Sequence, residues 1–157
     1  MTQEQKKAPE FSLLNQDDQT RSLSDYAGKR LIVYFYPKDN TSACTKQAIA
    51  FSENKQAFDE LKVHIIGISK DSTRSHKSFE TKQNLSVELL SDPETTVQQS
   101  YGVWKEKSMY GRKYMGTERS TFLISADGII EKVWQKVKVN GHIEDILNYL
   151  KQHPSPA

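Results

Sequence analysis

Two continuous apolar runs dominate the hydrophobic pattern of this chain. Residues 31–36 read Leu-Ile-Val-Tyr-Phe-Tyr, and residues 63–68 read Val-His-Ile-Ile-Gly-Ile. Unbroken runs of β-branched and aromatic residues are typical of strands that are buried on both faces of a sheet. Pro37 ends the first run. We therefore predict two central strands.

Between these runs the apolar positions change to helical spacing. From Thr41 onward, apolar side chains recur three, four or seven residues apart, at Cys44, Ala48, Phe51, Phe58 and Leu61. This spacing predicts one helix of about five turns. A strand, a helix and a second strand in this order form the βαβ unit of a parallel sheet.

The rest of the chain predicts further helices. Residues 74–84 are polar with Phe79 on one side, and residues 143–150 place apolar side chains at helical spacing. Asp92-Pro93 is a typical helix start, with Asp92 as N-cap and Pro93 at the first helical position.

A hairpin is predicted near the end of the chain. Residues 121–124 and 129–134 are strand-like and flank Asp127-Gly128, a strong turn signal. The sum is an α/β, thioredoxin-like fold with a mixed central sheet, parallel in its centre and covered by helices. A chain of 157 residues is the usual size of one domain, so we expect a single domain over residues 1–157.

The composition narrows the classes of function. Lys plus Arg number 22 and Asp plus Glu number 20, so little positive charge is left to bind a nucleic-acid backbone. Residues 105–114 mix basic and aromatic side chains, and we interpret them as a solvated loop. No segment has the roughly 20 apolar residues of a membrane span, and residues 1–9 carry no signal-peptide core. We therefore expect no nucleic-acid or membrane partner and a cytoplasmic location.

The chain has one cysteine, Cys44. It cannot form an internal disulfide, so one free thiol needs an explanation. If Thr41 is the N-cap, Cys44 is the third helical residue and lies among backbone N–H groups without helical acceptors. These groups and the helix dipole stabilise a thiolate.

Ionisation alone adds little reactivity, because a free thiol is already a few per cent thiolate near pH 7. When a thiolate attacks an oxygen atom and displaces another, as it would with a peroxide, negative charge develops on the departing oxygen. Fixed donors aimed at that oxygen can each contribute about 3 kcal/mol. Thr41 and an arginine are candidates.

Several strings resemble the peroxiredoxin family. They are the strand ending in Tyr36-Pro37, the spacing Thr41-x-x-Cys44, and Arg119 in Arg119-Ser120-Thr121-Phe122-Leu123-Ile124. Further strings are similar to its bacterioferritin comigratory protein, or PrxQ, branch: Ser69-x-Asp71-Ser72, Leu89-Leu90-Ser91-Asp92, Tyr101-Gly102-Val103-Trp104, Met109-Tyr110-Gly111-Arg112 and Gly141-His142. The resemblance covers about residues 8–151.

The resemblance implies a role for each site residue. Cys44 would be the peroxidatic cysteine, Thr41 would hydrogen-bond the peroxide, Pro37 would shield the thiolate, and Arg119 would hold and polarise the peroxide. It also favours a monomer. Arginine suits its role because it stays charged and presents a rigid fork of donors.

The chain departs from the family pattern at two places. Ser42-Ala43 stand where the family usually has Pro-Gly, which we expect to have a modest effect because Ala is a better helix former than Gly. Ile49 stands where many members carry a resolving cysteine. An oxidised Cys44 must then be reduced by an external thiol, from thioredoxin or from glutathione with glutaredoxin.

Other interpretations remain open beside these. Taken alone, Cys44 is a small buried hydrophobe, Thr41 an N-cap and Arg119 a surface charge. His64, His76, His142 and His153 are scattered without ligand spacing, so we expect no metal, and no cofactor is implied. Against a peroxidase of hydrogen peroxide and organic hydroperoxides stands a redox sensor that uses Cys44 oxidation. A thiol–disulfide oxidoreductase is disfavoured by the absence of Cys-x-x-Cys.

Overall fold

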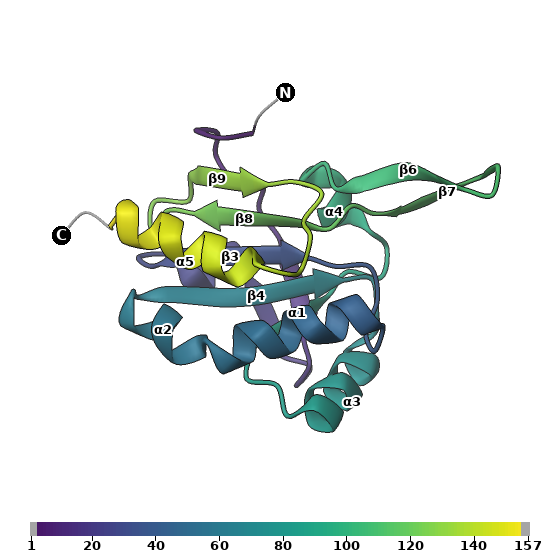
Figure 1. The fold of residues 1–157 in the computed structure, drawn as a ribbon, viewed down its shortest axis with the longest axis horizontal. Coiled ribbons are helices and arrows are strands. Elements are labelled where there is room, and N and C mark those ends of the chain that lie inside the picture. Colours follow the sequence, from purple (N-terminus) through teal and green to yellow (C-terminus); the bar gives the residue numbers. More distant parts are fainter. Residues whose placement is uncertain (1–2, 155–157) are drawn as a thin grey trace.

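The computed structural model describes residues 3–154 and is built around a mixed sheet with helices on both faces (Figure 1). The strand order is β2-β1-β5-β4-β3-β8-β9. The strands are β1 (Ser12–Asn15), β2 (Thr20–Ser22), β3 (Arg30–Phe35), β4 (Val63–Ser69), β5 (Glu88–Ser91), β8 (Ser120–Ile124) and β9 (Ile130–Trp134).

The central strands have the predicted directions. β3 and β4 are parallel, with Arg30 opposite Val63 and Phe35 opposite Ile68, and β4 is parallel to β5. β8 pairs antiparallel with both β3 and β9. The mixed sheet, the two central strands and the late hairpin are therefore confirmed.

The sheet divides the core into two layers, each covered by helices, and β3 is therefore buried on both faces. The helices are η1 (Leu23–Tyr26), α1 (Ser42–Glu53), α2 (Lys55–Glu60), α3 (Thr73–Gln83), α4 (Thr96–Ser100) and α5 (His142–Gln152). Ile32 and Tyr34 pack toward α1, α2, α3 and α5, whereas Leu31, Val33 and Phe35 pack toward η1 and α4. This alternation follows the two-residue period of a strand.

The five-turn helix predicted from Thr41 is interrupted. α1 ends at Glu53 and α2 begins at Lys55, with Asn54 between them. The Asn54 side-chain amide donates to the Ala50 carbonyl at 2.8 Å. Asparagine competes for backbone groups in this way and breaks helices for that reason.

The helix start predicted at Asp92-Pro93 is wrong. α4 begins at Thr96, and Thr95 is its N-cap. Asp92 still serves this helix from outside, because its carboxylate accepts from the backbone N–H groups of Val97 (3.4 Å) and Gln98 (2.9 Å). Pro93 lies in the intervening turn.

The loop predicted at residues 105–114 is also wrong, because these residues form a two-stranded ribbon. β6 (Trp104–Met109) and β7 (Arg112–Thr117) pair antiparallel and project beyond the sheet and helices (Figure 1). Tyr110 and Gly111 both have positive φ (51° and 77°), which is the geometry of a two-residue hairpin turn. Polar strands without a buried face gave no sequence signal. We call residues 104–117 the β6–β7 arm.

Candidate active site

Cys44 lies in the first turn of α1, just after the loop that follows β3. Thr41 has extended backbone angles (φ −84°, ψ 158°) and is the N-cap, so Cys44 is the third helical residue. The first helical hydrogen bond runs from the Thr45 N–H to the Thr41 carbonyl at 2.8 Å. The N–H groups of residues 42–44 therefore lack acceptors within the helix, and their dipoles favour negative charge on the nearby sulfur.

Behind the sulfur lies a tightly packed apolar wall. Cys44 is 1% exposed and belongs to the core cluster that includes Tyr34 and Phe51, whose rings stack 4.5 Å apart. A Cβ added to Gly67 would lie 2.6 Å from the Tyr34 ring, so a glycine is required at this position. The wall keeps water from that side of the thiol.

Arg119 reaches the sulfur from the other end of the chain. It lies one residue before β8, and its Nη2 donates to Cys44 Sγ at 3.2 Å. The fold therefore brings together two residues that are 75 positions apart in the sequence. A permanently charged guanidinium at this distance stabilises a thiolate.

Gln47 is a site residue that the sequence analysis missed. It is buried, and its Oε1 accepts from Arg119 Nη1 at 2.6 Å. Within residues 3–154, its Nε2 has no hydrogen-bond partner. Gln47 follows Cys44 by three residues in α1, and this spacing places the two side chains on one helix face. That spacing was the available signal.

Thr41 and Pro37 lie in the loop between β3 and α1. The exposed Thr41 hydroxyl donates to the Lys38 carbonyl at 2.8 Å and makes no cap hydrogen bond to the helix. Because its proton is used there, its oxygen keeps lone pairs that can accept a hydrogen bond from a ligand. Pro37 is half-buried at the start of the loop.

A buried polar network holds the middle of this loop. The carboxylate of Asp39 accepts from the Tyr36 hydroxyl (2.6 Å) and from Ser75 Oγ (2.8 Å), and it shares a 2.7 Å hydrogen bond with His76 Nδ1. His76 Nε2 lies 2.9 Å from the Leu90 carbonyl oxygen, to which it donates because a carbonyl can only accept. Side chains from α3 therefore fix the active-site loop.

The backbone of Asp39 is held as well. Its N–H donates to Asp71 Oδ2 at 2.9 Å, and the same oxygen accepts from Ser69 Oγ at 2.6 Å. The next residue, Asn40, has φ of +65°, a left-handed conformation that asparagine tolerates better than most residues. These contacts determine where the chain enters α1.

Three groups of the network lie close enough to share a cation. Ligand atoms of Asp39, Asp71 and His76 lie within 4.8 Å of one another, although the sequence showed no ligand spacing around His76. Each of the three already has hydrogen-bond partners in the network. We therefore interpret the cluster as a hydrogen-bonded support, and the absence of a metal stays a prediction.

Two titratable groups near the site, His142 and Tyr36, are neutral near pH 7. Burial lowers the pKa of His142 to about 4, a shift that Asp145 opposes and the positive charge of Arg119 reinforces. Its Nε2 lies 2.8 Å from Thr121 Oγ1. Burial, followed by the charge of Asp39, raises the pKa of Tyr36 well above its usual value. Arg119 is therefore the positive charge that contacts Cys44.

The helices of residues 3–154 are too short or too polar to cross a membrane.

Comparison with known proteins agrees with this geometry. Residues 5–133 match the AhpC/TSA family. Peroxiredoxin Bcp of Bacillus subtilis is 46% identical over 145 residues, which cover 92% of this chain and 92% of that protein.

Solved structures are similar in the same way. Xanthomonas campestris Peroxiredoxin Q has a TM-score of 0.87 and 40% identity, covering 91% of this chain and 90% of the other. A structure concerned with the alkyl peroxide reduction activity of the X. campestris bacterioferritin comigratory protein has a TM-score of 0.87 and 39% identity, covering 91% of each chain.

Proposed function

The chain belongs to the AhpC/TSA family as a peroxiredoxin of the Bcp type, and from this premise we propose that Cys44 is its peroxidatic residue. Membership makes the protein a peroxidase, an oxidoreductase that acts on peroxides. The observation that carries the assignment to Cys44 is the 3.2 Å contact between its Sγ and Arg119 Nη2 at the N-terminus of a helix.

In the first step the Cys44 thiolate attacks the nearer oxygen of a hydroperoxide ROOH. An S–O bond forms as the O–O bond breaks, the sulfur is oxidised to a sulfenic acid, and RO⁻ leaves and takes up a proton as ROH. Negative charge moves from sulfur to the leaving oxygen. Arg119 can stabilise the charge on both atoms, because its guanidinium group has more than one N–H donor.

The neighbouring residues have supporting roles. The Thr41 hydroxyl accepts a hydrogen bond from the peroxide O–H and orients it, and Pro37 shields the thiolate from water. Gln47 holds the Arg119 guanidinium in place, because its Oε1 accepts a 2.6 Å hydrogen bond from Arg119 Nη1. Orientation of this kind lowers a barrier because the reacting atoms are already placed.

The second half of the cycle uses an external thiol. Cys44 is the single cysteine of the chain, and Ile49 packs against the core at the position where many members have a resolving cysteine. A thiol R′SH attacks the sulfenic sulfur, water leaves, and a mixed disulfide forms; a second thiol then releases the Cys44 thiolate. Thioredoxin and glutathione with glutaredoxin are the candidate sources of thiol.

We propose hydrogen peroxide and organic hydroperoxides as the substrates. The alkyl peroxide reduction activity of the similar X. campestris protein supports the organic class. An organic hydroperoxide would reach the sulfur between the half-buried Pro37 and the exposed Thr41. We further propose that residues 1–157 work as one domain and as a monomer.

The test is rapid mixing of reduced protein with limiting hydrogen peroxide, followed through Trp104 and Trp134 fluorescence, with mass spectrometry of Cys44. We expect a second-order phase far faster than that of a free thiol, formation of a sulfenic acid, and loss of both in Cys44→Ser. Unchanged turnover in Cys44→Ser would rule out the assignment. Oxidation of Cys44 without turnover by any thiol would favour the redox sensor.

A further inference from the structure

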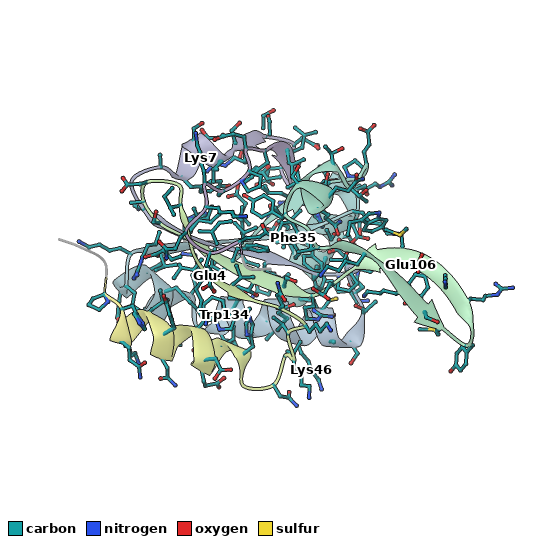
Figure 2. All side chains as sticks on the ribbon, turned by 90° about the horizontal axis from the view of Figure 1, so that it is seen from above. Glu4, Lys7, Phe35, Lys46, Glu106 and Trp134 are labelled. Carbon is teal, nitrogen blue, oxygen red and sulfur yellow. The ribbon has the colours of Figure 1, made fainter. Side chains whose placement is uncertain are left out.

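The β6–β7 arm exposes large apolar side chains that the rest of the protein leaves uncovered. Tyr110 at its tip is 99% exposed and Met109 is 54% exposed, and Tyr114 and Met115 are exposed as well. Figure 2 shows the arm, with Glu106 labelled, extending away from the packed body. A two-stranded ribbon is only marginally stable by itself, and clustered exposed apolar groups mark interaction sites.

The two faces of the arm differ. Lys107 pairs opposite Tyr114 and Met109 opposite Arg112, so these four side chains lie on one face. A Cβ added to Gly116 would lie 3.2 Å from Lys107 Cδ and 3.3 Å from the Tyr114 ring, which places both over that glycine. We call Lys107, Met109, Arg112 and Tyr114 the basic face.

The two positive side chains of the basic face form no ion pair among the described residues. Within residues 3–154, neither Lys107 nor Arg112 has an acidic group within ion-pair distance. Other cations of the arm do, because Lys105 pairs with Glu118 at 3.1 Å and Lys113 lies 3.9 Å from Glu106 on the opposite face. The basic face therefore combines two unpaired positive charges with a tyrosine and a methionine. That combination is complementary to an acidic surface with apolar contacts.

The base of the arm, where β6 begins and β7 ends, lies beside the candidate active site. β7 ends at Thr117, two residues before Arg119. At the start of β6, Lys70 Nζ lies over the Trp104 ring at 5.8 Å, and Lys70 precedes Asp71, which holds the active-site loop. A protein seated on the arm would thus lie at the end of the molecule where an oxidised Cys44 is reached.

We propose that the basic face of the β6–β7 arm is the docking surface for an acidic thiol protein, of the thioredoxin or glutaredoxin type, that reduces oxidised Cys44. This inference rests on the proposed function and names the partner of its second half. The partner's thiol attacks the sulfenic sulfur, water leaves, and the partner's second thiol or glutathione resolves the mixed disulfide. Cys44 is 1% exposed, so the arm would supply binding area that the sulfur does not.

The experiment uses the double variant Lys107→Glu/Arg112→Glu and measures three reactions separately. Peroxide oxidation is measured without reductant, and reduction is measured with dithiothreitol and with reduced thioredoxin or glutaredoxin. We expect the first two rates to stay within about twofold of the original protein. Reduction by the protein thiol should fall about tenfold or more, because charge reversal removes electrostatic steering. Added NaCl should slow reduction by the protein thiol less in the variant than in the original protein.

The matched control reverses two exposed lysines at the opposite end of the sheet. Lys7 and Lys29 both line a hollow beside residues 124–128, so Lys7→Glu/Lys29→Glu makes the same charge change away from the arm. We expect reduction by the protein thiol to be nearly unchanged in this control. Tyr114→Ala tests the apolar part of the face and should also slow only that reaction.

Three outcomes would overturn the docking proposal. They are equal slowing in the arm and control variants, slowing of the dithiothreitol reaction by the same factor, and turnover of the original protein with dithiothreitol but with neither protein thiol. Weakened binding of a single-stranded oligonucleotide in the arm variant, with unchanged reduction, would assign the arm to nucleic acid instead. Failure of the peroxide reaction in the original protein would refute the proposed function. This failure is distinguishable from failure of docking, because peroxide oxidation is measured without any reductant.

Discussion

The loop before Cys44 and the β6–β7 arm are both short polar segments, yet their surroundings are opposite. In the loop, Asp39 is 4% exposed and is bound through its backbone and its side chain. In the arm, the strands pair mainly with each other, and its tip residue Tyr110 is almost fully exposed. One segment is held from several elements, and the other projects into solvent.

The two surroundings suit the two segments to different tasks. A reaction at sulfur needs its charged groups fixed before the substrate arrives, because reorganisation would add to the barrier. A surface that binds a partner can remain open, because the partner itself completes the contacts. Substitutions in the two segments should therefore separate cleanly into effects on chemistry, on stability and on association.

The largest expected effect is on the peroxide reaction of Arg119→Lys. Lysine keeps the charge but loses the fork that contacts Cys44 and Gln47 together, so the rate with hydrogen peroxide should fall about 100-fold or more. The same exchange on the arm, Arg112→Lys, is the control and should leave this rate unchanged. Stopped-flow fluorescence measures both, and equal rates in the two variants would contradict the assigned role of Arg119.

The sharpest contrast in stability is between Asp39→Ala and Lys107→Ala. Removing Asp39 takes away the carboxylate that accepts from the Tyr36 and Ser75 hydroxyls and that partners His76 Nδ1, which costs about 3 kcal/mol. For a chain of this size the melting temperature should fall roughly 6–12 °C. Lys107→Ala should change the melting temperature by no more than about 2 °C, because an exposed side chain away from such networks contributes little to stability. Similar melting temperatures would mean that the network does not hold the loop.

A smaller effect is expected from Gln47→Ala. Loss of one hydrogen bond to a charged group, worth about 1.5 kcal/mol, should slow the peroxide reaction about tenfold without blocking it. Gln99→Ala, an exposed glutamine of α4, is the control. If Gln47→Ala reacts as fast as this control, Arg119 does not depend on Gln47.

The smallest effect is a pH dependence of stability from His142. Its pKa is lowered to about 4 in the folded protein, whereas a histidine in the unfolded chain has its ordinary pKa of about 6.5. The unfolded chain therefore binds more protons, and stability is lost as pH falls from about 6.5 to about 4. Thermal melts across this range should show a flatter profile for His142→Gln. An unchanged difference between the two proteins at every pH would contradict this.

The pattern of apolar residues predicted much of the fold but missed where some helices begin and end. The runs at residues 31–36 and 63–68 became β3 and β4 because unbroken β-branched segments have few other ways to bury both faces. The helix break at Asn54 and the late start of α4 at Thr96 were missed. Both involve hydrogen bonds from one polar side chain to the backbone, at Asn54 and at Asp92, which apolar spacing does not report.

The sequence was enough to place one cysteine in the first turn of a helix after a buried strand, since strand, turn and helix signals act over a few residues. It also determined that no second cysteine could close a disulfide. Three features required the packed fold: the contact of Arg119 with Cys44, the support of the loop by Asp39 and His76, and the projection of the arm beside the site. Those contacts join residues tens of positions apart, and their formation depends on how sheet and helices pack as a whole.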